Sequence, residues 1–251
     1  MINFSTSTAK DLQNFIKQKS FRKIFVITGK KSYNFSNADS ILNNILKNKI
    51  TKYYFKNLSY PDFSELTDII LSIRSFKPDI ILAVGGGTVI DYAKIANVLE
   101  IDKSIKNNIK NSSYKIKKKF CKLVAIPTTA GTGAEVTANA VIYINKIKYS
   151  VESEILKPDY FFLIPQLIIN SSRKIKSSTG FDAIAQAVES LISKKSNKTS
   201  INYAKKSLDL SLNYYLSFLN KPNKTNTSAM CVAANLSGKA ISISKTTAPH
   251  A

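Results

Sequence analysis

The first part of the chain alternates short apolar, β-branched runs with segments whose apolar positions recur at helical spacing. Buried strands are predicted at 23–28, 51–55, 80–84 and 121–126. Between them, helices are predicted over 40–46 and from Pro61 onward. Strands that alternate with helices in this way are typical of βαβ units around a parallel sheet.

The strand pattern stops near Arg173. Segments 182–193 and 202–219 both have helical spacing, and no strand is indicated between them. Residues 103–118 are polar and rich in lysine without a clear period, so we expect a surface loop there. The pattern predicts an α/β domain with a parallel sheet over residues 1–165, followed by an all-α domain over 166–251.

Composition favours a protein with a sizeable core and no membrane contact. Apolar residues make up 44% of the 251 residues, yet no apolar run is long enough to span a bilayer. The polar start lacks the features of a signal peptide, so we expect a cytoplasmic protein. Cys121 and Cys231 lie far apart in the chain, which indicates two small buried side chains rather than a disulfide framework or a zinc site.

The formal net charge of +21 would ordinarily point to an anionic partner such as a nucleic acid. Only Arg22, Arg74 and Arg173 are arginines, however, and lysine, asparagine and isoleucine are abundant along the whole chain. Nucleic-acid readers favour arginine for bidentate contacts. We therefore expect no nucleic-acid partner, and keep a basic nucleic-acid-binding protein as an alternative that would show steeply salt-dependent binding.

A glycine-rich turn, Gly85-Gly86-Gly87-Thr88, lies between the strand at 80–84 and the next helix. Such a turn exposes backbone N–H groups at a helix start, where an anion can bind, although glycines there can also serve only a tight turn. A second segment of small and hydroxyl residues, 127–137, follows the next strand. Ligands of open α/β sheets bind beyond the carboxyl ends of strands, so the two turns could hold one dinucleotide.

Three segments, 85–94, 127–137 and 179–190, occur in the order of the signatures of the iron-containing (group III) metal-dependent alcohol dehydrogenase family, which they resemble. The resemblance implies a dinucleotide-binding α/β domain, a helical domain, and a metal between them. It further implies roles for six residues in binding the cofactor: Gly86, Gly87 and Thr88 at the pyrophosphate, Thr128 and Thr129 along the cofactor cleft, and Lys148 in contact with the cofactor.

The cofactor implied is NADH or NADPH. Family members that prefer NAD carry an acidic residue after the first strand, and here Gly29 stands at that position, followed by Lys30 and Lys31. Because a missing carboxylate and two cations suit a 2′-phosphate, the sequence favours NADPH.

The same resemblance implies a site for Fe²⁺ or Zn²⁺. Asp182 and Gln186 are one helical turn apart on one face, and His250, the only histidine, matches a further metal-binding position. Gln186 is a weak ligand, since much of the family has histidine there. The family carries one more histidine beyond the point where this sequence ends, so we expect a C-terminally truncated chain.

The function implied is that of a metal-dependent alcohol dehydrogenase or aldehyde reductase, which transfers hydride between nicotinamide and a small alcohol or aldehyde. The pairing of segments 182–186 and 245–250 resembles the phosphonoacetaldehyde reductase branch. The resemblance also implies a homodimer. A catalytically inactive remnant that at most binds nucleotide is an alternative, as is a dehydroquinate-synthase-like lyase, which segment 127–133 fits less well.

Overall fold

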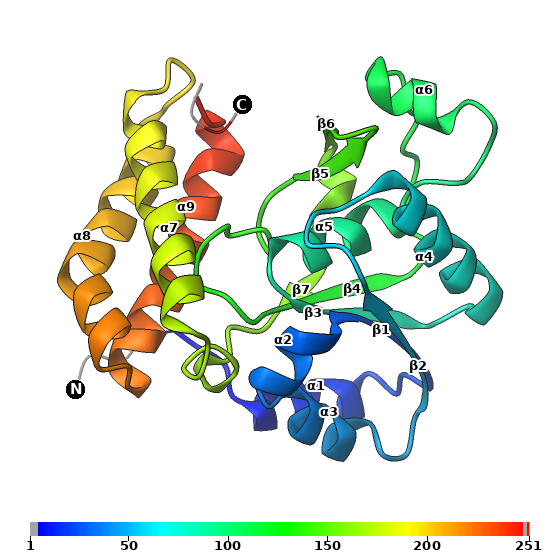
Figure 1. Cartoon of the computed structure of the whole chain (residues 1–251), viewed down its shortest axis with the longest axis horizontal. Coiled ribbons are helices and arrows are strands. Elements are labelled where there is room, and N and C mark those ends of the chain that lie inside the picture. Colours follow the sequence, from blue (N-terminus) through cyan, green and yellow to red (C-terminus); the bar gives the residue numbers. More distant parts are fainter. Residues whose placement is uncertain (1–4, 248–249, 251) are drawn as a thin grey trace.

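The computed structural model describes residues 5–247 and 250, and it has an α/β part and a helical part side by side (Figure 1). The α/β part contains, in chain order, α1 (Ala9–Gln18), β1 (Lys23–Gly29), α2 (Lys30–Phe35), α3 (Ala38–Leu46), β2 (Ile50–Lys56), α4 (Phe63–Phe76), β3 (Ile80–Gly85), α5 (Gly87–Ala96), α6 (Ile105–Lys110), β4 (Lys122–Pro127), β5 (Asn139–Ile144), β6 (Ile147–Glu152) and β7 (Tyr160–Phe161). The helical part contains α7 (Arg173–Ile192), α8 (Lys198–Asn220) and α9 (Lys224–Ser244).

The main sheet has five strands in the order β2-β1-β3-β4-β7, and every neighbouring pair is parallel. All four predicted strands are present in it. The predicted fold class, a parallel-sheet α/β region followed by an all-helical region, is confirmed.

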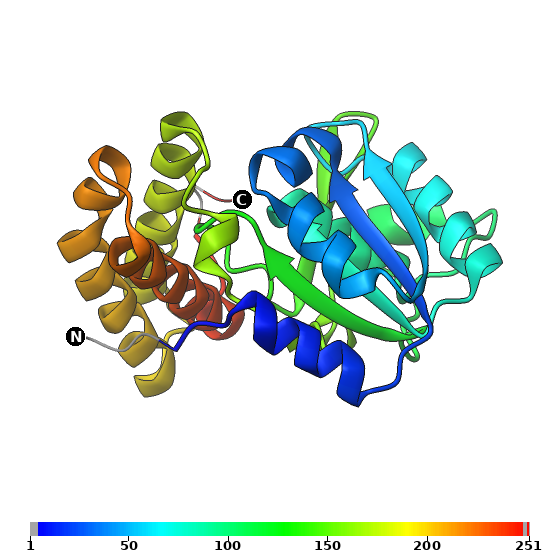
Figure 2. The same cartoon turned by 90° about the horizontal axis from the view of Figure 1, so that it is seen from below.

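Helices cover both faces of this sheet (Figure 2), which explains why its inner strands β1, β3 and β4 are buried almost along their whole length. On β1, Phe25 and Ile27 pack with α4 and α5 on one face, whereas Ile24 and Val26 pack with α1, α2 and α3 on the other. This alternation follows from the two-residue period of a strand. With both faces covered, the carboxyl edge of the sheet is where a ligand can reach the strands.

The sequence prediction missed or misjudged several short elements. The helix α1, with its capping box of Thr8 and Asp11, was not predicted, nor was the β5–β6 hairpin. The expectation of a plain loop over 103–118 was wrong, because α6 forms there and buries Ile105 and Ile109 against the core. A helix this short leaves too few residues for a visible period.

The helical part meets the α/β part through the loop between β4 and β5. Gly133, with φ of +60°, lies against Gly238 of α9, and a Cβ at Gly238 would lie 2.6 Å from the Gly133 oxygen. Buried Glu135 accepts a hydrogen bond of 2.9 Å from the amide nitrogen of Asn235, also on α9. Backbone contact and buried polar contact together fix this loop against α9.

Both cysteines are free thiols, with Cys231 buried and Cys121 half-buried. Among the described residues, none of the helices combines the length and apolarity needed to cross a lipid bilayer.

Candidate functional site

The glycine turn stands where β3 passes into α5. Gly86 occupies the N-cap of α5, and no side chain caps this helix. A Cβ on Gly86 would lie 3.3 Å from Thr129 Oγ1, and one on Gly87 would lie 3.0 Å from the Thr132 side chain. The absence of side chains at these two positions therefore lets the turn lie directly beside the loop that follows β4.

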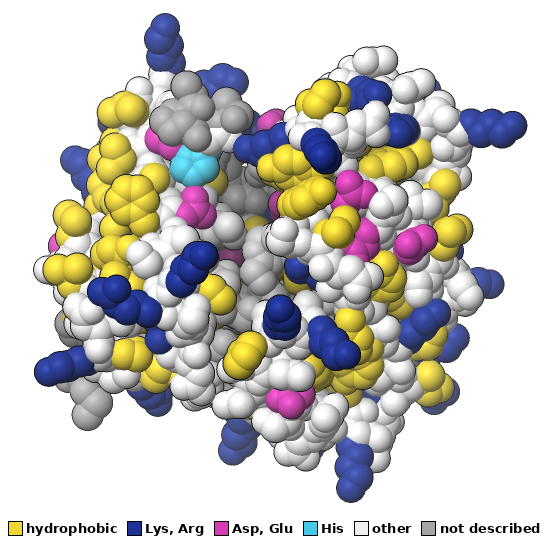
Figure 3. Space-filling view, viewed as in Figure 1, with side chains coloured by type: hydrophobic (Ala, Val, Ile, Leu, Met, Phe, Trp, Pro, Cys, Tyr) yellow, Lys and Arg dark blue, Asp and Glu magenta, His cyan; other side chains and the backbone are white. Residues whose placement is uncertain are grey.

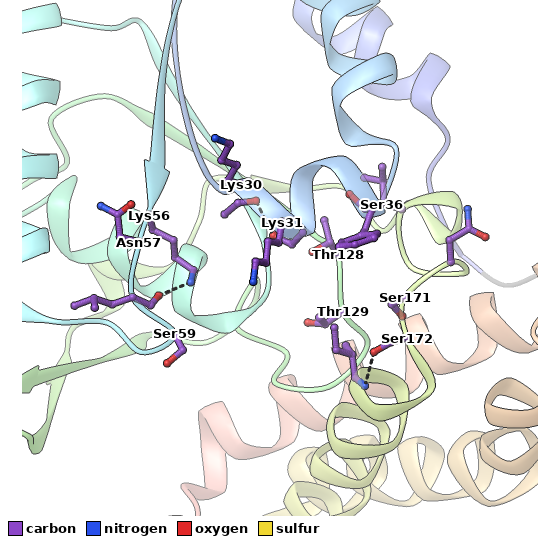
Figure 4. A pocket seen from close by; sticks show the side chains of 17 residues that line it. Lys30, Lys31, Ser36, Lys56, Asn57, Ser59, Thr128, Thr129, Ser171 and Ser172 are labelled. Atoms are coloured by element: carbon purple, nitrogen blue, oxygen red, sulfur yellow. Dashed lines mark hydrogen bonds between the residues drawn. The ribbon is translucent and has the colours of Figure 1, made fainter.

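A cavity of about 820 Å³ opens at the carboxyl edge of the sheet, between the two parts (Figure 4). Thr128 and Thr129, both predicted cofactor residues, line it. Its wall is drawn from the ends of three strands and from the start of the helical part: Gly29, Lys30, Lys31, Ser32, Phe35, Ser36, Lys56, Asn57, Leu58, Ser59, Thr128, Thr129, Leu167, Asn170, Ser171, Ser172 and Ile175. The two turns that the sequence suggested for one dinucleotide thus meet at one edge of the sheet.

The remaining turn residues border this cavity without lining it. Thr88 Oγ1 donates a hydrogen bond of 3.2 Å to the carbonyl of Ser59, which is itself a lining residue. Gly86 lies directly beside Thr129, which lines the cavity. The turn therefore forms the rim at which backbone amides are available to an anion.

Two buried ionisable groups, Lys94 and Glu135, and the half-buried Asp91 support the segments behind the turn. The Lys94 ammonium donates to Thr137 Oγ1 (2.8 Å) and to the carbonyl of Asn139 (3.0 Å), and burial lowers its pKa to about 8. Burial raises the pKa of Asp91 to about 6, although the Lys94 ammonium opposes this, and burial also raises the pKa of Glu135. These groups are engaged in holding the loop and the β5–β6 hairpin.

The predicted metal-binding residues come together in the helical part. Figure 3 shows the histidine side chain (cyan) and an acidic side chain (magenta) next to it, on the helical side of the hollow between the two parts. His250 Nε2 lies 2.9 Å from Asp182 Oδ1, although the two residues are 68 positions apart. Gln186 Nε2 donates to Asp182 Oδ2 at 3.3 Å, and the Gln186 carbonyl accepts a hydrogen bond of 3.1 Å from Ser237. Ala248 and Pro249 of the same motif, and Ala251, lie outside the described residues.

Glu189 also contacts this cluster, and sequence reasoning did not single it out. Its carboxylate hydrogen-bonds His250 Nδ1 and accepts bonds from the backbone nitrogen (2.6 Å) and hydroxyl (2.8 Å) of Thr247. Burial favours the neutral acid, but these hydrogen bonds outweigh it and lower the pKa of Glu189. Burial likewise opposes the charged form of His250, yet the carboxylates of Asp182 and Glu189 outweigh it and raise the pKa of the imidazole.

Lys148 is an exposed residue of β6 and is not among the residues that line the cavity. Its ammonium donates a hydrogen bond of 2.7 Å to the backbone carbonyl of His250. This contact joins the α/β part to the segment that carries the histidine, close to the cluster of Asp182, Gln186 and His250.

The donor set fits a divalent metal ion in its chemistry. A carboxylate oxygen, an imidazole nitrogen and an amide oxygen are all ligands for Fe²⁺ or Zn²⁺. The 2.9 Å between Asp182 Oδ1 and His250 Nε2 is close to the ~3 Å that separates two ligands of one ion. Within residues 5–247 and 250, no three His, Cys, Asp or Glu side chains are gathered to hold a metal, so among these residues the Gln186 amide is the remaining candidate for a third ligand.

An amide oxygen facing the metal requires Gln186 to turn its amide group over. The Ser237 hydroxyl donates to the carbonyl of Ala234 (2.9 Å) as well as to Gln186. It can therefore accept a hydrogen bond from the turned amide nitrogen and keep its own donor satisfied by Ala234. Both orientations of the Gln186 amide are compatible with its buried surroundings.

Comparison with known protein families matches residues 1–165 to the model of the iron-containing alcohol dehydrogenases. The chain is similar to long-chain-alcohol dehydrogenase 1 of Geobacillus thermodenitrificans, with 35% identity over 129 residues, which cover 51% of this chain and 33% of that protein. It is also similar to 4-hydroxybutyrate dehydrogenase of Clostridium kluyveri, with 32% identity over 168 residues, which cover 66% of this chain and 44% of that protein. The chain thus spans less than half the length of either relative.

Solved structures share the fold of the whole chain. Sulfoacetaldehyde reductase from Bifidobacterium kashiwanohense, in complex with NAD⁺, aligns with a TM-score of 0.88 over 100% of this chain and 69% of its own, at 24% identity. An iron-containing alcohol dehydrogenase from Thermotoga maritima aligns with a TM-score of 0.85 over 98% of this chain and 70% of its own, at 26% identity. The helical part, which lies beyond the matched 1–165, therefore shares its fold with these proteins.

Proposed function

The chain belongs to the iron-containing alcohol dehydrogenase family, and from this premise we propose that the whole protein transfers hydride between a nicotinamide cofactor and a small alcohol or aldehyde. The observation that supports this most directly is the convergence of Asp182 and His250, with 2.9 Å between their side chains, in a chain whose strand-edge cavity is lined by Thr128 and Thr129, two of the predicted cofactor residues. The proposed units are the α/β domain of residues 1–165 and the helical domain from residue 166.

The α/β part would bind the cofactor. Backbone amides of Gly86, Gly87 and Thr88 are available to the pyrophosphate, and Thr128 and Thr129 face the cavity with hydroxyl groups. Lys148 supplies a positive charge beside the His250 segment, where it would contact the cofactor near its reacting end. A dinucleotide bound along these residues would run from the cavity toward the cluster on α7.

The helical part would hold the metal through Asp182 and His250, with Gln186 as a third, weaker ligand. When bound, Fe²⁺ or Zn²⁺ supplies Lewis-acid polarisation of a carbonyl group. The side chains of the chain then orient the reactants: Asp182 and His250 set the position of the ion, and the turns around Gly86 and Thr128 set that of the cofactor.

We also propose NADPH as the preferred cofactor. Lys30, Lys31 and Lys56 all line the cavity, and Gly29 stands where a carboxylate would repel a 2′-phosphate. The Ser32 hydroxyl donates to the Gly29 carbonyl at 3.0 Å. The Lys56 ammonium donates to the carbonyl of Leu58 at 2.6 Å, so a 2′-phosphate would share or replace this bond.

The proposed substrate is a small aldehyde, with phosphonoacetaldehyde as the specific candidate. Support comes from the sequence pairing of segments 182–186 and 245–250. The Lys245 ammonium, which could neutralise a phosphonate, is paired at 2.8 Å with Glu152, so phosphonate binding there would have to break this ion pair. Comparing kcat/KM for phosphonoacetaldehyde and acetaldehyde tests the candidate, because equal values would remove the case for a phosphonate.

The test of the dehydrogenase proposal is the oxidation of NADPH or NADH by small aldehydes, followed by absorbance, with Fe²⁺ or Zn²⁺ added. Asp182→Ala should lower the rate about a hundredfold, because the ion loses its only carboxylate ligand. Asp209→Ala, an exposed acid on α8, is the matched control and should leave the rate unchanged. Cofactor binding without turnover in the wild type would instead support the inactive remnant.

The homodimer is likewise a proposal. Light scattering of the purified chain measures its molar mass directly, and a value of one chain would contradict it.

A further inference from the structure

We infer that Glu189 is a positioning residue that fixes the tautomer and orientation of His250, so that the bare Nε2 of the neutral ring faces Asp182. This inference rests on the proposed metal site for its consequence, and on the hydrogen bonds of Glu189 for its argument. No motif position suggested this role, since it depends on a contact with a residue 61 positions away.

Glu189 is almost fully buried, with 4% of its surface exposed. One carboxylate oxygen faces His250 Nδ1, and the other accepts the backbone N–H and the hydroxyl of Thr247 at 2.6 and 2.8 Å. An ionised carboxylate can only accept hydrogen bonds. Asp182 is a second carboxylate beside the ring, 2.9 Å from Nε2, so a neutral ring has one proton for two acceptors. The Glu189 side chain is 5% exposed against 27% for Asp182, and Asp182 also accepts a hydrogen bond from Gln186, so Glu189 depends more on the ring N–H and the proton belongs on Nδ1.

The proton on Nδ1 decides the state of the other nitrogen. In a neutral imidazole only one nitrogen is protonated, so Nε2 retains its lone pair. This lone pair lies 2.9 Å from Asp182 Oδ1, and a metal ion that binds both atoms would replace the repulsion between them with two ligand bonds. A histidine that ligates a metal through one nitrogen commonly donates its other N–H to a carboxylate, and this partner sets both tautomer and ring orientation.

Glu189 also holds the backbone that carries the histidine. Its two bonds to Thr247 tie the segment after α9 to α7, while Lys148 binds the His250 carbonyl from the β5–β6 hairpin at 2.7 Å. The imidazole is thus fixed at its ring by Glu189 and at its backbone from two elements.

The experiment uses the full chain labelled with ¹⁵N-histidine. Since His250 is the only histidine, one pair of ring nitrogen signals reports its tautomer without assignment work. In metal-free protein at alkaline pH, where the ring is neutral, the wild type should show the proton on Nδ1. In Glu189→Gln, the amide oxygen should remain with the two Thr247 donors, so the NH₂ group would face Nδ1 and move the ring proton to Nε2.

The same variants are then titrated with Zn²⁺ by calorimetry. Glu189→Gln should bind Zn²⁺ about 10- to 100-fold more weakly than the wild type. Glu152→Gln is the matched control, because Glu152 is an exposed acid that pairs with Lys245 and does not touch His250, and it should change neither the tautomer nor the affinity. Thr247→Val removes one hydrogen bond but keeps the ionised carboxylate, so the Nδ1 proton should remain.

The outcomes separate this inference from the proposed function. A proton on Nε2 in the neutral wild-type ring, or unchanged tautomer and Zn²⁺ affinity in a folded Glu189→Gln, would overturn the role of Glu189. A wild type that has the Nδ1 proton but binds no Zn²⁺ would support the role of Glu189 in orienting the ring and would contradict the metal site. If Glu189→Gln does not fold, the wild-type and Thr247→Val signals still decide the tautomer.

Discussion

Lys30, Lys31 and Lys56 reach one cavity because β1 and β2 are adjacent parallel strands that end at the same edge of the sheet. Lys56 is the last residue of β2, and the other two begin α2 directly after β1. The sequence alone suggested the first two lysines, and strand pairing adds the third. Three lysines among 17 lining residues match the share of lysine in the chain, 34 of 251, so their common position at the strand ends, and not their number, favours a phosphate there.

The cofactor preference can be tested on these residues. The double variant Lys30→Ala/Lys31→Ala should raise the Kd for NADPH about tenfold, equivalent to about 1.4 kcal/mol, and leave the Kd for NADH within about twofold. The reason is that only NADPH carries a phosphate at the ribose 2′ position. Fluorescence titration with each cofactor measures both constants.

Lys110→Ala provides the control for this pair, since it removes an exposed lysine from α6, away from the cavity. Equal weakening of NADPH and NADH in the double variant would mean that the two lysines contribute general charge rather than recognition of the 2′-phosphate.

Individual site residues differed in how far the sequence could specify them. Asp182 and Gln186 share a helix face by simple spacing, and local sequence was enough to place them together. Glu189 lies in the same segment, yet its importance depends on where the chain returns after α8 and α9. Contacts such as Glu189 with His250 follow from helix packing, which local periodicity does not encode.

At the scale of elements, the contact between the β4–β5 loop and α9 depends on Gly238. A Cβ there would lie 2.6 Å from the oxygen and 2.7 Å from the Cα of Gly133, both backbone atoms that cannot move aside easily. Gly238→Ala should therefore lower the free energy of unfolding by about 3 kcal/mol. Urea denaturation followed by circular dichroism measures this change.

Ser242→Ala, on the same helix at a half-buried position, is the comparison and should change stability by less than about 0.5 kcal/mol. A similar, small effect of Gly238→Ala would show that the loop can shift away from α9 at little cost.

The edge of the sheet between β4 and β7 is stabilised by Asp159. Its side chain is 15% exposed and accepts bonds from the Leu123 backbone nitrogen (3.0 Å), Lys119 (2.9 Å) and Lys122 (3.2 Å). Burial alone would raise the pKa of this acid, but the hydrogen bonds outweigh burial and lower it below 3.8. Because the folded-state pKa is the lower one, this stabilisation exists above pH 3.8 and is lost as the pH falls through the folded-state value.

Asp159→Asn should then lower the free energy of unfolding by about 1 kcal/mol at neutral pH, a modest value because the lysine partners are partly exposed to solvent. The difference from the wild type should shrink as the pH falls below 3.8. Thermal unfolding at several pH values tests this, and a difference that is constant with pH would assign the effect to packing instead of charge.

The elements that the sequence specified best were the central strands. Segments 80–84 and 123–126 are continuous apolar runs because helices bury both of their faces, and this gives a clear local signal. The hairpin of β5 and β6 has one exposed strand, with burial only at Val151 in a largely polar run, so its pattern is weak. Helix α6 depends on two side chains, Ile105 and Ile109, that are buried only because the α/β core lies beneath them.

At the scale of the whole molecule, the net charge of +21 creates a positive field that attracts any anion. A general field and a specific site differ in how salt affects them. Exposed charges are screened over about 10 Å at 0.1 M salt, whereas hydrogen bonds from backbone amides at a turn act at contact. The proposed cofactor site around Gly86 and Thr128 would act by such contacts, whereas lysines outside it would contribute only to the field.

Salt dependence therefore distinguishes a cofactor-binding enzyme from the nucleic-acid-binding alternative. Raising salt from about 50 to about 200 mM should weaken NADPH binding only severalfold, and NADH binding less, because few phosphates are bound and the turn amides carry no net charge. A protein whose function is to neutralise six or more phosphates of a duplex would lose about a thousandfold in affinity over the same range. Anisotropy titrations with a labelled duplex, run beside the cofactor titrations, measure both affinities.

The two outcomes have different meanings. If the duplex bound more tightly than NADPH at the higher salt, the lysine-rich surface would contain a specific nucleic-acid-binding site. If the duplex is released and NADPH stays bound, the positive charge is a property of composition and the binding site is the one at the sheet edge.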